Sequence, residues 1–501
     1  MVFNSFSFLL FFPIVVWIYF IIPKKIRYIW LLIASYYFYM SWNARYALLI
    51  AASTLITYVS GLLLERADAV SEQEKQASLK KWIVAGSFVT NLGILFFFKY
   101  FDFALSVLNR LLGGLGIGIV EKPFDVLLPV GISFYTFQAL SYTMDVYRGQ
   151  LKAEKNLLRY ALFVSFFPQL VAGPIERSTS LLGQLGRVHE IKLWNYDRIT
   201  SGLSMMLWGY FMKMVIADRL AIYVDNVFDN YTQYGATVLI LGAVFFAFQI
   251  YCDFGSYSLI AIGSAKVMGF TLMENFDTPY FSRSIKEFWR RWHISLSTWF
   301  RDYLYIPLGG SRKGKIRTYV NLMITFLASG LWHGASFSFV VWGGLHGLYQ
   351  IIGSVLKPCK RKLTDALRVK TDCYSYELLQ CIITFVLVDF AWIFFRANSL
   401  SAAAAYLGRI VRHADPWALF DGSVFAAGLS MPEFLVAVCG LLILLAVDRI
   451  RCRKGMQLDA YLNTQSLWYR WGVYIFLICS ILIFGIYGTA YDATEFIYFQ
   501  F

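Results

Sequence analysis

Long apolar stretches alternate along the chain with short segments that are basic or contain Gly and Pro. A helix needs about 20 mainly apolar residues to cross roughly 30 Å of hydrocarbon, because lipid offers no hydrogen-bond partner to the backbone. The pattern therefore predicts an all-α polytopic membrane protein. The candidate spans are residues 7–23, 28–42, 46–64, 82–99, 126–144, 157–173, 200–217, 236–263, 319–352, 376–396, 432–448 and 471–489.

The apolar segment 319–352 predicts a break inside the membrane. Both flanks are basic, with Arg317 before it and Lys357 after it, and basic residues favour the cytoplasmic ends of spans. The segment must then cross an even number of times, although a single helix of this length would extend only about 50 Å. The expected turn is SGLWHGAS at 329–336, whose glycines permit a break. His333 is therefore expected deep in the bilayer.

Clusters of basic residues predict the orientation of the spans. The four densest clusters, which we place inside, are Lys24/Lys25/Arg27, Arg312/Lys313/Lys315/Arg317, Lys357/Lys360/Arg361/Lys362 and Arg449/Arg451/Arg453/Lys454. The first apolar run precedes its basic residues, the reverse of a cleavable signal peptide, so it is predicted to be a retained span. Both termini are then predicted to be extracytoplasmic, with residues 491–501 at the outer face.

Composition supports a membrane protein and excludes several other classes. Hydrophobic residues make up 58% of the chain and charged residues 15%, whereas soluble domains have about 25% charged residues. The net charge of +14 comes from short runs between apolar segments, which indicates membrane topology rather than nucleic-acid binding. The seven cysteines form no CxxC pair, so neither a disulfide framework nor a metal site is predicted. Without repeats or linkers, residues 1–501 are expected to form a single domain.

Among the residue types that could take part in catalysis, histidine is the rarest, with five in the chain. An ionisable residue at membrane depth is costly to desolvate and indicates function, and imidazole suits proton transfer near neutral pH. The alternative is a neutral imidazole bonded to a backbone carbonyl. The in-membrane break favours function for His333. A structural role is favoured for His346, His189 and His413.

The segment FWRRWHISLSTWFRDY at 288–303 interleaves aromatic and cationic residues. This pattern is typical of an interfacial helix with its rings at headgroup depth. It is also typical of a site for an anionic donor, in which Arg290, Arg291 and Arg301 would meet phosphates while a ring such as Trp292 stacks on a base. The residues alone leave both interpretations open.

Other polar motifs are less specific. The segment GGSRKGKI at 309–316 lacks the final hydroxyl of a phosphate-binding loop, so a basic cytoplasmic turn is predicted. Asp145, Asp253 and Asp389 lie in apolar stretches. Asp253, with Tyr251 nearby, belongs either to a buried structural network or to the lining of a substrate path, for which Trp332 is a further candidate.

Several of these stretches together resemble the membrane-bound O-acyltransferase (MBOAT) family, and within it the alginate O-acetyltransferase branch. The matching stretches are LPVGISFYTFQ at 128–138, VAGPIER at 171–177, YCDF at 251–254, residues 288–310, LWHG at 331–334 and EFIYFQF at 495–501. The resemblance covers nearly the whole chain. One small departure is Gly255-Ser256, where related chains are expected to have Ser-Gly.

The resemblance implies a ring of spans thinned at the centre, with a cytoplasmic funnel for an acyl donor and an outer opening for the acceptor. It implies that His333 is the essential histidine and His293 a second one near the cytoplasmic side. Acetyl-CoA or another acyl donor would be a substrate, with no permanently bound cofactor. The implied partners, besides membrane lipid, are an SGNH-like acetyltransferase or polysaccharide machinery outside a bacterial inner membrane.

The predicted function is therefore acyl transfer across the membrane for O-acetylation of an exopolysaccharide such as alginate, directly or through a partner. Acetyl is the predicted acyl group, and D-alanyl is the alternative left open by related enzymes. His333 would act as the general base toward a hydroxyl. A solute transporter or lipid flippase is the alternative, since such proteins also use intramembrane His and Asp and broken helices. The paired halves common in transporters do not occur in this sequence.

Overall fold

The computed structural model describes all residues except 117, 123–127, 172, 488–496 and 498–501. The described residues are mostly helical and include no strand, which confirms the all-α class. They form two compact units, residues 1–203 with 261–273 and residues 204–260 with 274–501. The single domain over 1–501 and the ring of spans stay predictions.

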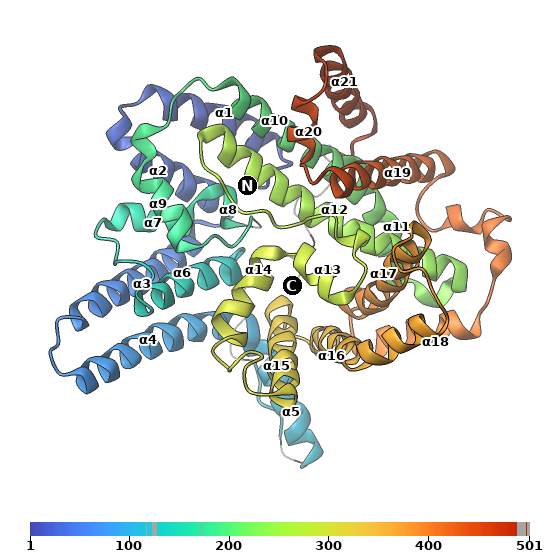
Figure 1. Ribbon diagram of the computed structural model, residues 1–501, viewed down its shortest axis with the longest axis horizontal. Coiled ribbons are helices and arrows are strands. Elements are labelled where there is room, and N and C mark those ends of the chain that lie inside the picture. Colours follow the sequence, from blue (N-terminus) through green and yellow to red (C-terminus); the bar gives the residue numbers. More distant parts are fainter. Residues whose placement is uncertain (117, 123–127, 172, 488–496, 498–501) are drawn as a thin grey trace. The chain divides into compact units, whose positions relative to one another are not determined.

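The first unit contains the N-terminal helices. They are α1 (Phe6–Ile21), α2 (Arg27–Met40), α3 (Ala47–Ala67), α4 (Gln73–Leu95), α5 (Phe101–Gly114), α6 (Ile132–Tyr147), α7 (Leu157–Ser165), α8 (Phe167–Leu170) and α9 (Ser178–Gly186). Helices α3, α4 and α6 pack side by side (Figure 1). A Cβ atom added at Gly61 would lie 2.6 Å from the Tyr142 hydroxyl, so the small residue permits close approach of α3 and α6.

The second unit carries most of the candidate chemistry. Its helices are α11 (Asp218–Asp229), α13 (Ile285–Arg291), α14 (Ile294–Phe300), α15 (Lys315–His333), α16 (Phe337–Ala366), α17 (Tyr374–Arg396), α18 (Leu400–Arg412), α19 (Met431–Lys454), α20 (Leu458–Asn463) and α21 (Leu467–Phe484). Helices α10 (Tyr196–Tyr210) and α12 (Ala236–Met268) contribute residues to both units.

Within the described residues, eight helices are long and apolar enough to span a membrane, which confirms a polytopic protein. They are Ala44–Ala67, Gln73–Gly114, Tyr196–Asp229, Ala236–Met268, Phe337–Ala366, Tyr374–Arg396, Met431–Lys454 and Leu467–Phe484. Several expected spans have other bounds. The expected span 82–99 is part of one continuous helix that ends at Gly114 and includes α4 and α5. The span expected at 157–173 is divided into α7 and α8, with non-helical backbone at Phe166 between them.

The segment 319–352 forms the expected helical hairpin. Helix α15 ends at His333, Gly334 has extended backbone, and α16 begins at Phe337 (Figure 1, yellow). Helix α16 is longer than expected, because it continues past Lys357 to Ala366. The basic cluster that begins at Lys357 is therefore helical. Residues 309–314 of the basic segment form the predicted turn, with positive φ at Gly309, Gly310 and Gly314, and the last two residues begin α15.

Two glycines bring the arms of the hairpin together. A Cβ atom added at Gly330 would lie 2.3 Å from the Phe339 carbonyl oxygen, and one added at Gly343 would lie 2.3 Å from the Phe326 carbonyl oxygen. Small residues allow helix backbones to approach closely where no hydrophobic effect drives them together. The two arms are therefore in backbone contact beside His333.

Candidate active site

His333 occupies the C-terminal end of α15, directly before the break in the hairpin. Its side chain is 4% exposed, and that of Trp332 is also buried. The His333 ring lies 5.0 Å from the Trp342 ring on α16 and 5.5 Å from the Phe395 ring on α17, measured between centroids. The imidazole thus lies among aromatic rings, in surroundings of low polarity that strengthen electrostatic interactions.

His293 lies in the connection between α13 and α14, outside the eight candidate spans. It is fully buried, and its backbone has φ 44° and ψ 54°, the left-handed region. Its Nδ1 atom is 3.1 Å from Oδ1 of Asn275. Burial lowers the pKa of His293 to about 3, because desolvation disfavours the charged ring, so the imidazole is neutral.

The fold brings these two histidines together. The ring centroids of His293 and His333 are 6.2 Å apart, and the Trp332 ring is 5.9 Å from that of His293. The residues come from separate elements, α15 and the turn between α13 and α14, so no sequence spacing indicates their proximity. Two imidazoles at this separation can both reach groups of one reacting centre.

A third histidine extends the same cluster. His346 on α16 is fully buried, and its Nδ1 atom accepts a hydrogen bond of 3.2 Å from Nε1 of Trp289 on α13. Its ring centroid is 5.1 Å from that of Trp342, which also packs against His333. The hydrogen bond connects the hairpin to the helix that precedes His293. This contact is between side chains, whereas the sequence suggested a bond to a backbone carbonyl.

The four candidate donor-binding residues have different surroundings. Arg290 is exposed and has no ion pair or hydrogen bond with any residue that the structure describes. Arg301 is exposed and forms an ion pair of 2.7 Å with Asp302. Trp292 is buried, with its ring stacked 5.4 Å from that of Phe288, so it supports the aromatic core rather than a surface site.

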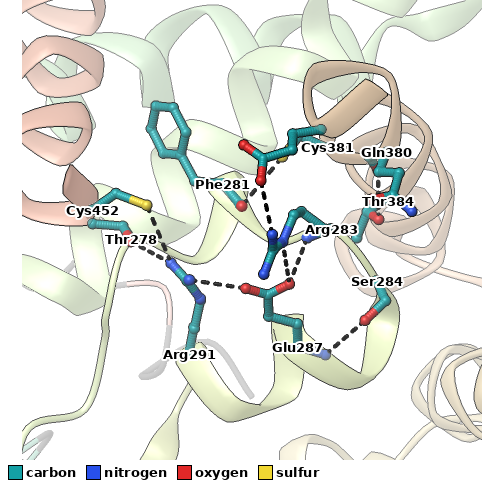
Figure 2. Close-up of polar contacts among 11 residues, drawn as sticks. Thr278, Phe281, Arg283, Ser284, Glu287, Arg291, Gln380, Cys381, Thr384 and Cys452 are labelled. Carbon is teal, nitrogen blue, oxygen red and sulfur yellow. Dashed lines mark hydrogen bonds and ion pairs between the residues drawn. The ribbon is translucent and has the colours of Figure 1, made fainter. Parts of the chain in front are cut away.

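The fourth candidate, Arg291, is part of a polar network on α13 (Figure 2). Its guanidinium donates hydrogen bonds to Oε1 of Glu287 at 2.9 Å and to Oγ1 of Thr278 at 2.8 Å, and it contacts Sγ of Cys452 at 3.9 Å. Glu287 also pairs with Arg283. Arg291 therefore holds α13 in place within the unit and is already engaged by protein groups.

Asp253 and Tyr251, proposed to line a substrate path, belong to hydrogen-bonded networks. Asp253 accepts a short hydrogen bond from Nζ of Lys213 and one of 2.9 Å from the backbone N–H of Ile497. The hydroxyl of Tyr251 donates to Asp448 on α19 at 3.0 Å. Their polar groups are satisfied within the unit, which favours the structural alternative. The lining role stays a prediction.

Sequence reasoning missed the partners of these groups. Lys213 and Asp218 form a buried ion pair of 2.8 Å beside Asp253, and Asn275 holds His293. An Asn in a polar loop carries no recognisable signal. Lys213, within an apolar stretch, did carry one, because a buried cation requires a nearby carboxylate. In the described part of the chain no group of three or more His, Cys, Asp or Glu residues could hold a metal ion.

Comparison with known proteins shows the family of the chain. The model of the membrane-bound O-acyltransferase family matches residues 151–396, a range that includes both histidines. The chain is 41% identical over 445 residues to the probable alginate O-acetylase AlgI of Pseudomonas putida, covering 87% of this chain and 86% of that protein. The chain belongs to the membrane-bound O-acyltransferase family. It is an O-acyltransferase embedded in a membrane by several helices.

Relatives with lower sequence identity are named for other acceptors or other acyl groups. This chain is 35% identical over 410 residues to the peptidoglycan O-acetyltransferase of Helicobacter pylori, covering 76% of this chain and 73% of that protein. It is 28% identical over 239 residues to the teichoic acid D-alanyltransferase of Bacillus subtilis, covering 46% of this chain and 59% of that protein. These relatives are all transferases, and they lend no support to a transporter.

Proposed function

We propose that the acyltransferase moves an acetyl group from acetyl-CoA at the cytoplasmic face of a bacterial inner membrane toward an exopolysaccharide such as alginate outside. The observation that carries the proposal is the pair His293 and His333, buried 6.2 Å apart within one unit. The greatest similarity among the relatives named above is to a probable alginate O-acetylase, which favours acetyl over D-alanyl.

In this scheme His333 is the general base. A hydroxyl attacks the thioester carbonyl while His333 removes its proton, the C–O bond forms, and the C–S bond then breaks. The protonated His333 returns the proton to the departing thiolate, so the side chain ends as it began. General-base catalysis of this kind typically contributes 10²–10⁴-fold. The buried aromatic surroundings keep water from competing with the hydroxyl.

The donor's phosphates are proposed to meet the cations of the 283–317 segment. Arg290 is exposed and has no protein partner in the described residues, so it is available to a phosphate. Arg301 is also exposed, although it pairs with Asp302. Arg291 and Trp292, which the fold engages internally, would contribute by holding α13 in place. A guanidinium is well suited to phosphate because it can donate two parallel hydrogen bonds.

The final acceptor is proposed to receive its acetyl group through an extracytoplasmic partner of the SGNH-like class or directly from the acyltransferase. Both termini of the chain are proposed to lie outside the cytoplasm. This arrangement needs no passage of the whole donor, because donor and acceptor approach one buried imidazole from opposite faces of the membrane.

The test uses purified protein in vesicles with radiolabelled acetyl-CoA on one side and alginate oligosaccharides, with and without membrane extract, on the other. His333→Ala is expected to lower acetyl transfer by 10²-fold or more, following the typical contribution of a general base. His413→Ala is the matched control, since His413 is an exposed residue, and it should retain full activity. Normal transfer by a correctly folded His333→Ala protein would overturn the proposal. If the protein transferred D-alanyl from a D-alanyl donor but no acetyl from acetyl-CoA, the assigned acyl group would change to D-alanyl.

A further inference from the structure

We propose that Asn275 is a positioning residue that holds His293 in the tautomer with its proton on Nδ1, so that Nε2 is the atom that accepts hydrogen bonds. The tautomer itself follows from hydrogen-bond geometry alone. Its catalytic meaning rests on the proposed function, because it defines what the second histidine can do during acyl transfer.

The first step is the orientation of the Asn275 amide. Its Oδ1 atom receives the backbone N–H of Ser295 at 3.3 Å and the Ser295 hydroxyl at 2.9 Å, while its Nδ2 atom donates to Oγ of Ser258 at 3.1 Å. A backbone N–H can only donate. Exchanging the amide O and N atoms would place an NH₂ group against that N–H. The atom that faces Ser295 is therefore the oxygen.

The second step is the proton of His293. Its Nδ1 atom lies 3.1 Å from the same Asn275 oxygen, which can only accept. A hydrogen bond between them requires the proton on Nδ1. A neutral imidazole carries one N–H, so Nε2 retains its lone pair. The tautomer is thus inferred from its partners, as it must be where hydrogen atoms are not observed.

The backbone reinforces this arrangement. A left-handed conformation such as that of His293 is unfavourable for a non-glycine residue and persists only where the surroundings hold it. Here the N–H of Ile294 donates to the Asn275 carbonyl at 2.9 Å, and the N–H of Asp277 donates to the Arg291 carbonyl at 2.9 Å. Asn275 therefore binds the His293 turn with both its backbone and its side chain.

The surroundings of His293 limit what the ring can meet. The aromatic side chains that pack against it include those of Phe254, Phe276 and Trp332, and the ring of His333, a titratable group, also faces it. With Nε2 as an acceptor, His293 binds a group that carries a proton, such as a hydroxyl or a protonated imidazole. It does not donate to the oxyanion that forms at the carbonyl. His293 is thus assigned an accepting role beside the general base.

Nitrogen NMR of the full-length protein in lipid tests the tautomer directly. The chain has only five histidines, so ¹⁵N-histidine labelling gives few signals, and a His293→Gln sample identifies the one of interest. We expect a protonated Nδ1 and a non-protonated Nε2 in the parent protein. Asn275→Leu, which removes the acceptor, should shift the ring toward the other tautomer. A protonated Nε2 in the parent protein would overturn the inference.

Kinetics separate positioning from mere stability. Release of CoA thiol from acetyl-CoA is measured for Asn275→Leu and Asn275→Asp against Asn321→Leu and Asn321→Asp. Asn321 is a fully buried Asn on α15 that donates to the Gly310 carbonyl. We expect Asn275→Leu to lower kcat at least about 10-fold with little change in KM for acetyl-CoA, whereas Asn275→Asp restores an acceptor and rescues most of kcat.

The pH profile adds a readout that stability alone would not move. The carboxylate in Asn275→Asp favours the charged form of His293 and should shift the acidic limb of the kcat profile to higher pH, while Asn321→Asp leaves that limb in place. Identical profiles for the two Asp variants would contradict the assignment. If the NMR spectrum shows the expected tautomer but neither Asn275 variant affects acyl transfer, the positioning role of Asn275 fails and the tautomer stands. A parent protein that shows the tautomer but transfers no acetyl would instead overturn the proposed function.

Discussion

Glu287 neutralises one cation just before α13 and another at the C-terminal end of that helix, whereas a third cation has no ion pair among the described residues. Its carboxylate pairs with Arg283 and Arg291, and Arg283 has a second partner in Glu377 (Figure 2). Arg290 projects into solvent without a partner among the described residues. Arginines that lie close together in sequence thus have different roles. Only a guanidinium that forms no ion pair with the protein has its N–H donors available to a ligand.

Replacing Arg290 tests this difference at the level of one residue. Arg290→Gln is expected to raise KM for acetyl-CoA by about 10-fold with kcat nearly unchanged, because a hydrogen bond to a charged group contributes about 1.5 kcal/mol or more. Steady-state kinetics with purified protein measure it. Arg283→Gln, which removes an ion-paired cation just before the same helix, should leave KM within a factor of two. Equal effects of the two substitutions would remove donor binding from Arg290.

Glu176 in the first unit provides a pH test of stability. Burial raises the pKa of its carboxyl from 4.5 to about 7, although the N–H of Met273 and the charge of Arg177 favour the ionised form. Because the folded protein holds the proton more tightly, the stability that this group contributes is complete below about pH 4.5 and is lost as the pH rises through about 7.

Glu176→Gln resembles the protonated side chain and should abolish that loss. Above pH 7 the variant is expected to be more stable than the parent by on the order of 3 kcal/mol, and the difference should vanish near pH 4.5. Thermal unfolding in lipid or detergent across this range measures it. Glu190→Gln, at a side chain that is 61% exposed, serves as the control. A constant difference at all pH values would show that ionisation is not the cause.

At the scale of elements, the α15–α16 hairpin determines where His333 lies. Backbone contact at Gly330 and Gly343 holds its arms together, and the bond from Trp289 to His346 attaches α16 to α13. The turn that carries His293 follows α13 directly. The distance between the rings of His293 and His333 therefore depends on these contacts between helices.

Enlarging one of these glycines tests the hairpin. In Gly343→Ala the new methyl group would meet the Phe326 carbonyl oxygen at 2.3 Å, so the helices must separate. We expect a loss of about 1–3 kcal/mol in stability and a fall in acyl transfer, since His333 moves with α15. Gly353→Ala lies on the same helix with nothing within 4 Å and should be neutral or slightly stabilising. Unfolding curves and transfer rates that agree between the two variants would contradict this account.

For the whole molecule, the orientation in the membrane follows from the distribution of charge. Basic residues occupy the C-terminal half of α16 and the end of α19, and both places are predicted to be cytoplasmic. The connection that contains α18 lies between α17 and α19, two candidate spans, and is therefore predicted to lie outside.

Reporter fusions decide this orientation. A fluorescent protein joined after residue 367 should fold and fluoresce in the cytoplasm, while alkaline phosphatase joined after residue 413 should be active outside. Exchanging the reporters gives the matched controls, which should be silent at both positions. Activity of the phosphatase after residue 367 would reverse the assignment, and with it the proposed side of donor entry.

Hydropathy, charge and local turn chemistry were sufficient to predict much of the secondary structure and the membrane class. The membrane class, most helix positions and the break beside His333 follow from the sequence, because helix formation and membrane insertion depend on residues close together in the chain. Helix length was predicted less well. The continuation of α16 past Lys357 and the long helix through residues 73–114 are mostly exposed, and they extend beyond the apolar stretches because polar residues such as Lys, Arg and Gln are also good helix formers.

The sequence by itself determined that this chain is a membrane protein and, through its family motifs, which two histidines are predicted to take part in catalysis. Only the tertiary structure decided what those histidines contact: Asn275 beside His293, and Trp342 and Phe395 beside His333. The physical reason is that side-chain hydrogen bonds and ring contacts form between residues distant in sequence. Their geometry depends on how helices pack, which periodicity along the chain does not encode.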